Sequence, residues 1–393
     1  MTGDAGFLER LRKQLSELQS QSRLRSRRTV TSISSTECLI DQKRCINFGT
    51  NDYLGLRHDP AVCRAFSEVA ADQAGSGASA LIAGRTPWHE KLEAALAELE
   101  HADGIVLFPS GFAANIGTLN SLITPKDGVF CDRDNHASII DGCRSSSGRM
   151  WVYDHSDLSR LEESISRRRH EHDQVFIVTD TVFSMDGTIA SLGSLCDIAD
   201  RQRAVVIVDE AHATGVFGAS GGGVCELQGV GHRVPVRIGT LSKALGCQGG
   251  FVCGSRELCE WLWNSARSQF FSTALPPAVC AAVLESIRIV RTEPERRSRL
   301  QELCSFARQR ILEYRLITIP DGEGPIIPIV LGSENAAMEV SARLQQRGFF
   351  APAIRPPTVA AGTSRLRLSL CADHSQTQID DGLREIRSIL DHQ

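Results

Sequence analysis

The sequence predicts an α/β protein with a large, mostly parallel β-sheet domain and a smaller C-terminal α+β domain. From about residue 46 to 280, short apolar segments alternate with longer segments of helical periodicity. The short segments are apolar throughout, which is typical of parallel strands buried on both faces. A long helical stretch, residues 291–314, then leads to strand-like segments that flank one more helix. We therefore expect an N-terminal helix and arm (1–45), a large domain (46–283) and a small domain (284–393).

The elements follow from the pattern in chain order. "FLERLRKQLSELQ" repeats Leu at helical spacing and continues into an Arg/Ser-rich arm, "SQSRLRSRRTVTS". In "TPWHEKLEAALAELE", Thr86 and Pro87 mark a helix start, and Leu92, Leu96 and Leu99 are expected in the core. The expected strands of the large domain are "GIVLF", "GVFCD", "QVFIVTD", "AVVIVDE", "VPVRIGT" and "GGFVCG". In the small domain, "PIIPIVL" and "RLRLSL" are strand-like and flank the helical "NAAMEVSARLQQRG".

Composition and charge exclude several classes of protein. With 393 residues, 42% apolar and 23% charged, the chain has globular composition. A net charge of -4 gives no electrostatic footprint for nucleic acid. No apolar run approaches a membrane span, and the charged N-terminus lacks the apolar region of a signal peptide, so we expect a cytoplasmic protein. The 13 cysteines are scattered without a CxxC pair, which fits neither a disulfide framework nor a zinc site.

Common nucleotide and metal motifs are absent or misplaced. "GSGASA", residues 75–80, formally matches the dinucleotide pattern GxGxxG/A, but it follows the helix-like "AVCRAFSEVAADQA" where that fold needs a strand. The chain contains neither GxxxxGK[ST] nor HExxH. His89 lies in the first turn of a predicted helix, where a structural histidine is more common than a ligand.

Polar residues follow three of the predicted strands. Ser110 and Gly111 form a strand-to-helix turn after "GIVLF", and a helix N-terminus there is a ready anion site. Asp209 and His212 lie in "DEAHATG" at the end of "AVVIV". Lys243 lies in "GTLSKALGCQGG", after "VPVRI". Taken alone, Lys243 is more simply a surface lysine, and the Ser110 turn is equally well an ordinary capped turn. Asp209, a carboxylate at the end of a buried strand, must have a partner. In such sheets, however, ligands bind at the carboxyl ends of the strands.

Together these features match the needs of pyridoxal 5′-phosphate (PLP). This cofactor requires a lysine for its Schiff base, an acidic residue at its pyridine nitrogen and an anion site for its phosphate. Lys243, Asp209 and the Ser110 turn supply one each. His212 is expected to bind the phenolic oxygen or Asp209 itself. Further hydroxyl donors to the phosphate are expected from the residues that flank the lysine, Thr240 and Ser242.

A longer set of motifs resembles the α-oxoamine synthases. It comprises "NDYLGL", "SGFAAN", "HASIIDG", "VFSMDG", "DEAHATGVFG", "FSTALPP" and "AIRPPTVAAGTSRLRLSL", in this order from about residue 45 to near the C-terminus. The last block is most similar to the branch that condenses L-alanine with a pimeloyl thioester to give 8-amino-7-oxononanoate, carbon dioxide and free thiol in biotin synthesis. The resemblance implies a PLP-dependent homodimer of fold type I, with active sites shared between subunits and an acyl donor carried by coenzyme A or acyl carrier protein.

The resemblance also implies roles for individual residues. Lys243 would be the Schiff-base lysine and catalytic base, Asp209 the pyridinium partner and His136 the imidazole stacked on the cofactor ring. The phosphate would be bound at the Ser110 turn by residues Gly111 and Phe112, by Thr240 and, from the other subunit, by Thr273. The phenolic oxygen would face His212 and Ser184.

For the substrates, the resemblance implies that Asn51 and Arg367 hold the amino acid's carboxylate and that Thr358 lies near the acyl group. One position departs from the family pattern. Where the family usually has His or Arg after the glycine-rich turn, this chain has Leu81 in "GSGASALIAGRT". The departure bears on acyl specificity and leaves the PLP site untouched.

Other functions remain open from the sequence. Within the same family the alternatives are aminolevulinate synthase, glycine C-acetyltransferase and a serine palmitoyltransferase-like enzyme. A non-catalytic partner subunit would not need both Lys243 and Asp209. A transaminase would release no carbon dioxide.

Overall fold

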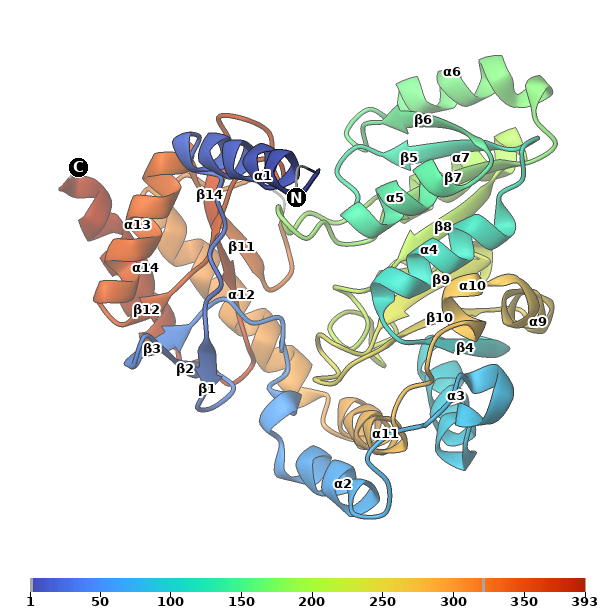
Figure 1. Cartoon of the computed structure of the whole chain (residues 1–393), viewed down its shortest axis with the longest axis horizontal. Coiled ribbons are helices and arrows are strands. Elements are labelled where there is room, and N and C mark those ends of the chain that lie inside the picture. The colour runs from blue at the N-terminus through green and yellow to red at the C-terminus, as the bar shows by residue number, and fades with distance from the viewer. Residues whose placement is uncertain (1–2, 320–321, 393) are drawn as a thin grey trace.

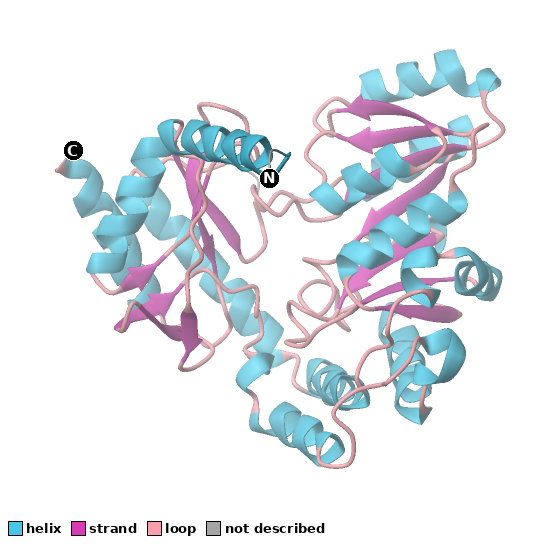
Figure 2. Cartoon of the chain, viewed as in Figure 1, coloured by secondary structure: helices cyan, strands magenta, loops and turns pink. Residues whose placement is uncertain are grey.

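The structure is a computed structural model that describes residues 3–319 and 322–392. Figures 1 and 2 show two lobes, one built around the largest sheet and the other containing the chain's N-terminal helix and its C-terminal helices. In the described part of the chain, no helix is long and apolar enough to cross a membrane. All 13 cysteines are free.

The large sheet has seven strands in the order β4-β10-β9-β8-β7-β5-β6. Neighbouring pairs from β9 to β6 are parallel, whereas β10 runs antiparallel to both β4 and β9. The strands are β4 (Gly104–Phe108), β5 (Gly128–Asp132), β6 (Arg149–Tyr153), β7 (Val175–Asp180), β8 (Val205–Asp209), β9 (Val236–Thr240) and β10 (Gly250–Gly254). All but β6 were predicted. As an edge strand, β6 is partly exposed and lacks the fully apolar run that marks the others.

Helices cover both faces of this sheet, as the buried strands predict. Within β8, Val206 and Val208 point into one core while Ile207 points into the other. The first core includes residues of α3 (Pro87–Glu100), α6 (Leu158–Arg168), α7 (Leu192–Gln202) and α11 (Pro277–Thr292). The second includes residues of α4 (Gly111–Leu122), α5 (Ala137–Ser145) and α9 (Arg256–Ser265).

The other lobe joins the two ends of the chain (Figure 1). A three-stranded sheet has the order β11-β14-β13, and a four-stranded sheet, β1-β2-β3-β12, brings N-terminal strands beside the C-terminal β12. These strands are β1 (Val30–Ser32), β2 (Glu37–Ile40), β3 (Lys43–Asn47), β11 (Ile326–Gly332), β12 (Phe349–Phe350), β13 (Ala353–Ile354) and β14 (Ser364–Ser369). The lobe's helices are α1 (Gly3–Ser20), α12 (Glu295–Glu313), α13 (Glu334–Gln346) and α14 (Gln376–Asp391). The domain boundaries at residues 46 and 284 stay predictions.

Shorter or connecting elements complete the chain. They are η1 (Leu56–His58), α2 (Pro60–Ala70), the π-helical turn η2 (Ala80–Gly84), η3 (Arg169–Glu171), α8 (Val224–Leu227), η4 (Gly231–Arg233) and α10 (Arg267–Phe270). Because α2 is a helix, "GSGASA" follows a helix rather than a strand, as predicted. His89 is structural, as expected, because its ring caps α3 and binds the Leu275 carbonyl.

Candidate active site

The carboxyl ends of the central strands converge on one cavity of about 200 Å³. β5, β7, β8 and β9 are parallel and end at Asp132, Asp180, Asp209 and Thr240. Eight of the residues predicted for the site line the cavity: Ser110, Gly111, Phe112, His136, Asp209, His212, Thr240 and Lys243. They share it with five further residues: Asn115, Ser138, Asp180, Ala211 and Ser242. Because the carboxyl ends of parallel strands meet at one edge of the sheet, residues that are far apart in sequence lie together here.

Lys243 lies just beyond β9 and is half-buried. Burial lowers the pKa of its amine to about 8, although the negative charges of Asp209 and Asp180 oppose this shift. A larger share of the amine is therefore neutral near physiological pH than in an exposed lysine. Only the neutral form can act as a nucleophile or a base.

Asp209 is buried at the end of β8, and two donors hold its carboxylate. The Asn115 side chain donates to Oδ2 at 2.6 Å, and the backbone N–H of Ala211 donates to Oδ1 at 2.7 Å. Asn115 comes from α4 and also donates to Ser138 on α5. Buried carboxylates need such partners, and these contacts fix the direction in which Asp209 faces the cavity.

The surroundings of the two cavity histidines favour the neutral form of the ring. His136 is the N-cap residue of α5, and its backbone N–H donates to Asp180 at 2.6 Å. Burial and, after it, the charge of Lys243 lower the pKa of His136, although Asp209 opposes the shift. Burial, Lys243 and Arg367 lower the pKa of His212 well below its ordinary value.

His212 does not bind Asp209, which was one of the two expectations. Its Nδ1 instead lies 2.6 Å from the Tyr53 hydroxyl, which is itself fully buried. With Nδ1 engaged, Nε2 is the ring nitrogen that can serve a ligand in the cavity. Tyr53 thereby fixes the orientation of His212.

The N-terminus of α4, which lines the cavity, can bind an anion. Ser110 caps α4 by accepting from the Ala113 N–H, while the N–H groups of Gly111 and Phe112 belong to the first helical turn, where helices leave donors without intrahelical partners. Gly250 lets strand β10 pack closely against the Ser110 turn, because a Cβ on Gly250 would lie 2.5 Å from the Ser110 carbonyl oxygen. Thr240 adds a hydroxyl that lies 2.8 Å from the Ser242 hydroxyl.

Arg367, on β14, is buried and held by three acceptors. Its Nε donates to the Ser184 carbonyl at 2.5 Å, and its Nη1 donates to Asn51 at 3.0 Å and to Ser369 at 2.8 Å. The predicted carboxylate pair, Asn51 and Arg367, is therefore in direct contact. These bonds engage Nε and Nη1, so Nη2 is the guanidinium nitrogen available to a substrate.

The other five predicted site residues do not line this cavity: Asn51, Ser184, Thr273, Thr358 and Arg367. Thr358 is exposed and accepts from Arg25 of the N-terminal arm at 3.5 Å. Thr273 is exposed and bridges to Ser79, beside η2. Leu81, in η2, is 49% exposed.

Sequence reasoning missed several polar residues of the site. Asn115 and Tyr53 are part of the motifs "SGFAAN" and "NDYLGL" but received no role. Asp180 ends "QVFIVTD", and because the carboxyl ends of parallel strands meet at one edge of the sheet, its position could have been predicted from the same rule as that of Asp209.

This donor set fits PLP. The cavity offers an amine with a lowered pKa, a fixed carboxylate and a helix N-terminus with free N–H groups. The cofactor needs one of each.

Comparison with known proteins agrees with this geometry. The family described as aminotransferase class I and II matches residues 43–386. An 8-amino-7-oxononanoate synthase of Methylococcus capsulatus is 46% identical over 374 residues, covering 94% of this chain and 95% of that protein. Another, from Lysinibacillus sphaericus, is 39% identical over 382 residues, covering 97% and 98%.

Among solved structures, a lysine-to-alanine variant of a serine palmitoyltransferase from S. paucimobilis with a bound PLP–myriocin aldimine matches with a TM-score of 0.92 at 29% identity, covering 98% of this chain and 97% of that one. These matches confirm the predicted PLP-dependent fold type I. The chain therefore belongs to the class I and II aminotransferase family and, within it, to the family of the 8-amino-7-oxononanoate synthases.

Proposed function

We propose that this protein uses PLP to condense L-alanine with a pimeloyl thioester, releasing carbon dioxide and free thiol and forming 8-amino-7-oxononanoate for biotin synthesis. The observation that carries the proposal is the single cavity where Lys243, Asp209, His136 and the N-terminus of α4 meet. The names of the two relatives support the choice of substrates. We place the reaction in the cytoplasm.

When bound, PLP supplies an electron sink for the pair released at the substrate's α-carbon. Lys243 would hold the cofactor through its amine and, once freed, take the α-proton. Its lowered pKa favours both tasks, because each needs the neutral amine. Asp209 would hold a proton on the pyridine nitrogen, and Asn115 keeps that carboxylate aimed at the cavity.

The two histidines would orient the cofactor. His136 would stack on its ring, and His212, with Nδ1 tied to Tyr53, would donate or accept through Nε2 at the phenolic oxygen, near Ser184. The phosphate would lie at the Ser110 turn, bound by the N–H groups of Gly111 and Phe112 and by the Thr240 hydroxyl. Each of these groups is positioned by contacts within the chain and needs little reorganisation on binding.

Arg367 would bind the alanine carboxylate together with Asn51. A guanidinium gives directed hydrogen bonds, so it fixes the direction of the substrate's α-carbon bonds as well as its charge. The contacts with Ser184 and Ser369 hold the guanidinium before substrate arrives. Thr358, on the surface beside the arm, would contact the acyl group.

We also propose a homodimer with shared active sites, in which Thr273 reaches the partner subunit's phosphate. Thr273 is exposed and does not line its own chain's cavity. Exposed apolar side chains of the same region support a subunit contact: Leu81, Ile82, Phe112 and Phe271. An acyl donor on coenzyme A and one on acyl carrier protein both remain candidates.

Complementation tests the shared site. Lys243→Ala and Thr273→Val, each poorly active alone, are mixed under subunit exchange. If Thr273 serves the partner subunit, each mixed dimer contains one site with both residues intact, and activity returns. If Thr273 serves its own chain's site, the mixed dimer has no intact site and activity stays low.

The reaction itself is tested with a matrix of amino acids and acyl thioesters. L-Alanine, glycine and L-serine are each combined with pimeloyl and palmitoyl thioesters, on coenzyme A and on carrier protein, and product mass and carbon dioxide are measured. Alanine with a pimeloyl thioester should give the dominant product. A serine palmitoyltransferase-like activity is the second candidate, because of the TM-score of 0.92, and dominance of serine with palmitoyl would replace the first proposal.

A further inference from the structure

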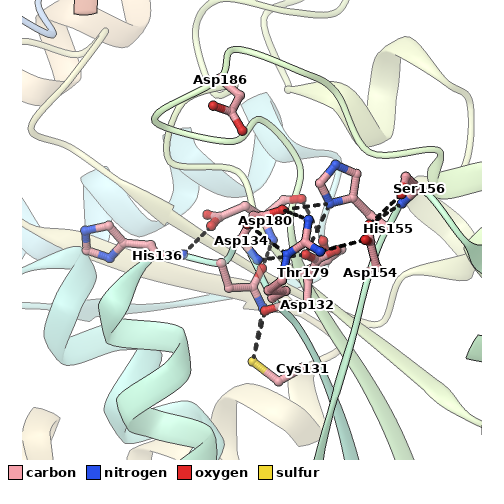
Figure 3. Close-up of polar contacts among 12 residues, drawn as sticks. Cys131, Asp132, Asp134, His136, Asp154, His155, Ser156, Thr179, Asp180 and Asp186 are labelled. Atoms are coloured by element: carbon pink, nitrogen blue, oxygen red, sulfur yellow. Dashed lines mark hydrogen bonds and ion pairs between the residues drawn. The ribbon is translucent and has the colours of Figure 1, made fainter. Parts of the chain in front are cut away.

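His155 lies just beyond β6, outside the cavity, at the centre of a polar cluster (Figure 3). Its Nδ1 is 3.2 Å from Asp132 Oδ1 and 3.9 Å from Asp134 Oδ2. The ligand atoms of these three residues all lie within 4.8 Å of one another, so the cluster has the composition of a small metal site.

The contacts within the cluster favour a protein cation over a metal ion. Arg133 already pairs with Asp134 at 3.0 Å and with Asp154 at 2.7 Å. Burial opposes a charge on His155, but its hydrogen bond to Asp132 and the nearby carboxylates outweigh burial and raise the pKa of the imidazole. Arg133 and a His155 ring that is more readily protonated than usual therefore offset part of the carboxylate charge without a metal ion.

On one side, His155 holds the loop that presents His136. Asp132 Oδ1 also accepts from the Asp134 N–H at 3.0 Å, which closes the turn after β5. Asn135 in the same turn accepts from the Asp180 N–H, and Asp180 accepts from the His136 N–H. The position of His136 thus depends on a turn whose first residue is fixed by His155.

On the other side, His155 packs on the loop that orients Arg367. Its ring stacks on Phe183, with ring centroids 4.1 Å apart and an interplanar angle of 16°. Phe183 is fully buried, and the next residue, Ser184, accepts from Arg367 Nε through its carbonyl oxygen. One imidazole therefore contacts both the β5 loop and the β7 loop, which carry different parts of the site.

We propose that His155 is a positioning residue that clamps these two loops together, so that His136 and Arg367 keep the places their ligands need. This rests on the roles proposed above for His136 and Arg367. The hydrogen bond to Asp132 acts on the cofactor side, and the stack on Phe183 acts on the substrate side. The two contacts can be removed separately.

The test compares His155→Phe, which keeps an aromatic ring beside Phe183 but has no N–H donor, with His155→Gln, which keeps a donor but has no ring. His232→Gln is the matched control, because His232 is exposed on η4. The readouts are the PLP dissociation constant, the visible absorption of the holoenzyme, and KM for alanine and for the thioester.

We expect His155→Phe to weaken PLP binding and shift the visible band, and His155→Gln to raise KM for alanine about tenfold while KM for the thioester changes little. The clamp would be overturned if His155→Phe changed KM for alanine and His155→Gln changed PLP binding instead. It would also be overturned if His155→Gln changed both KM values equally, or if neither variant changed any readout. If one variant does not fold, the other is still read against its own expected effect. PLP affinity and the visible band need no turnover, so they test the clamp even if the proposed substrates prove wrong.

Discussion

Asp180 and Asp209 lie directly opposite each other as register partners on the parallel strands β7 and β8. Both carboxyl groups are buried and line the same cavity. Burial and the charge of Asp209 raise the pKa of Asp180 well above its ordinary value. Two adjacent buried carboxylates cannot both be charged cheaply, and Asp180 is the member of the pair whose carboxyl group is driven towards the protonated form.

This asymmetry predicts different effects for two matched substitutions. Asp209→Asn removes the charge that would hold a proton on the cofactor nitrogen, and the loss of a charge-assisted hydrogen bond, about 1.5 to 3 kcal/mol, lowers kcat by roughly tenfold to a hundredfold. Asp180→Asn keeps an oxygen that can accept from the His136 N–H and should change kcat far less. The measurement is kcat of both variants from steady-state kinetics, with the PLP content determined on the same samples. Equal losses, or a larger loss for Asp180→Asn, would reverse the assignment.

The pKa of Lys243 predicts how the apoenzyme takes up PLP. Because the pKa is lowered to about 8, the neutral amine becomes the major form above about pH 8, whereas an ordinary lysine needs a far higher pH. The rate of borohydride-stable PLP attachment should therefore rise with pH and reach half its maximum near pH 8. Peptide mapping at each pH gives the rate for Lys243 and, as an internal control, for exposed Lys126. A Lys243 profile that coincides with that of Lys126 would contradict the lowered pKa.

Arg367→Lys tests orientation separately from charge. The substitution keeps a positive group but loses the directed contacts to Ser184 and Asn51. We expect KM for alanine to rise and kcat to fall, by about tenfold each, with little change in KM for the thioester. Arg355→Lys is the control on the same lobe, since Arg355 binds backbone carbonyls of the arm. If Arg367→Lys changes only KM for the thioester, Arg367 does not bind the amino acid.

The sequence was sufficient to place six of the seven strands of the large sheet and the polar residues at the carboxyl ends of its parallel strands. Fully apolar runs identify β5, β7, β8 and β9, and polar residues after such runs must meet at one sheet edge. Asp209, Lys243 and the Ser110 turn follow directly from that rule. The resemblance to a family was needed for His136 and Arg367, because a histidine after a turn and an arginine in "RLRL" carry no signal of their own.

Pairings between distant segments could not be predicted. Tyr53 and His212 are 159 residues apart, and Arg367 and Ser184 are 183 apart, so no local pattern connects them. The contact of β3 with β12 likewise joins the two ends of the chain. Such contacts depend on how the lobes pack, and hydrophobic periodicity describes only one element at a time.

The last prediction concerns Leu81, where the chain departs from its family. Leu81 lies in the π-helical turn η2, half-exposed, beside the bridge between Ser79 and Thr273. If Thr273 reaches the partner subunit's site, Leu81 lies near the same entrance and offers an apolar contact to an acyl chain. Replacing it with Arg removes that contact and adds a positive charge.

We therefore expect Leu81→Arg to favour acyl groups that end in a carboxylate. The measurement is the ratio of kcat/KM for pimeloyl-coenzyme A to that for heptanoyl-coenzyme A, which has the same chain length without the terminal carboxylate. The ratio should rise about fivefold, which corresponds to about 1 kcal/mol, the upper end of the range for a solvent-exposed ion pair. Ile82→Arg is the matched control, because Ile82 is adjacent and 78% exposed. If both variants shift the ratio equally, the effect is one of general surface charge. If Leu81→Arg leaves the ratio unchanged, Leu81 does not contact the acyl chain.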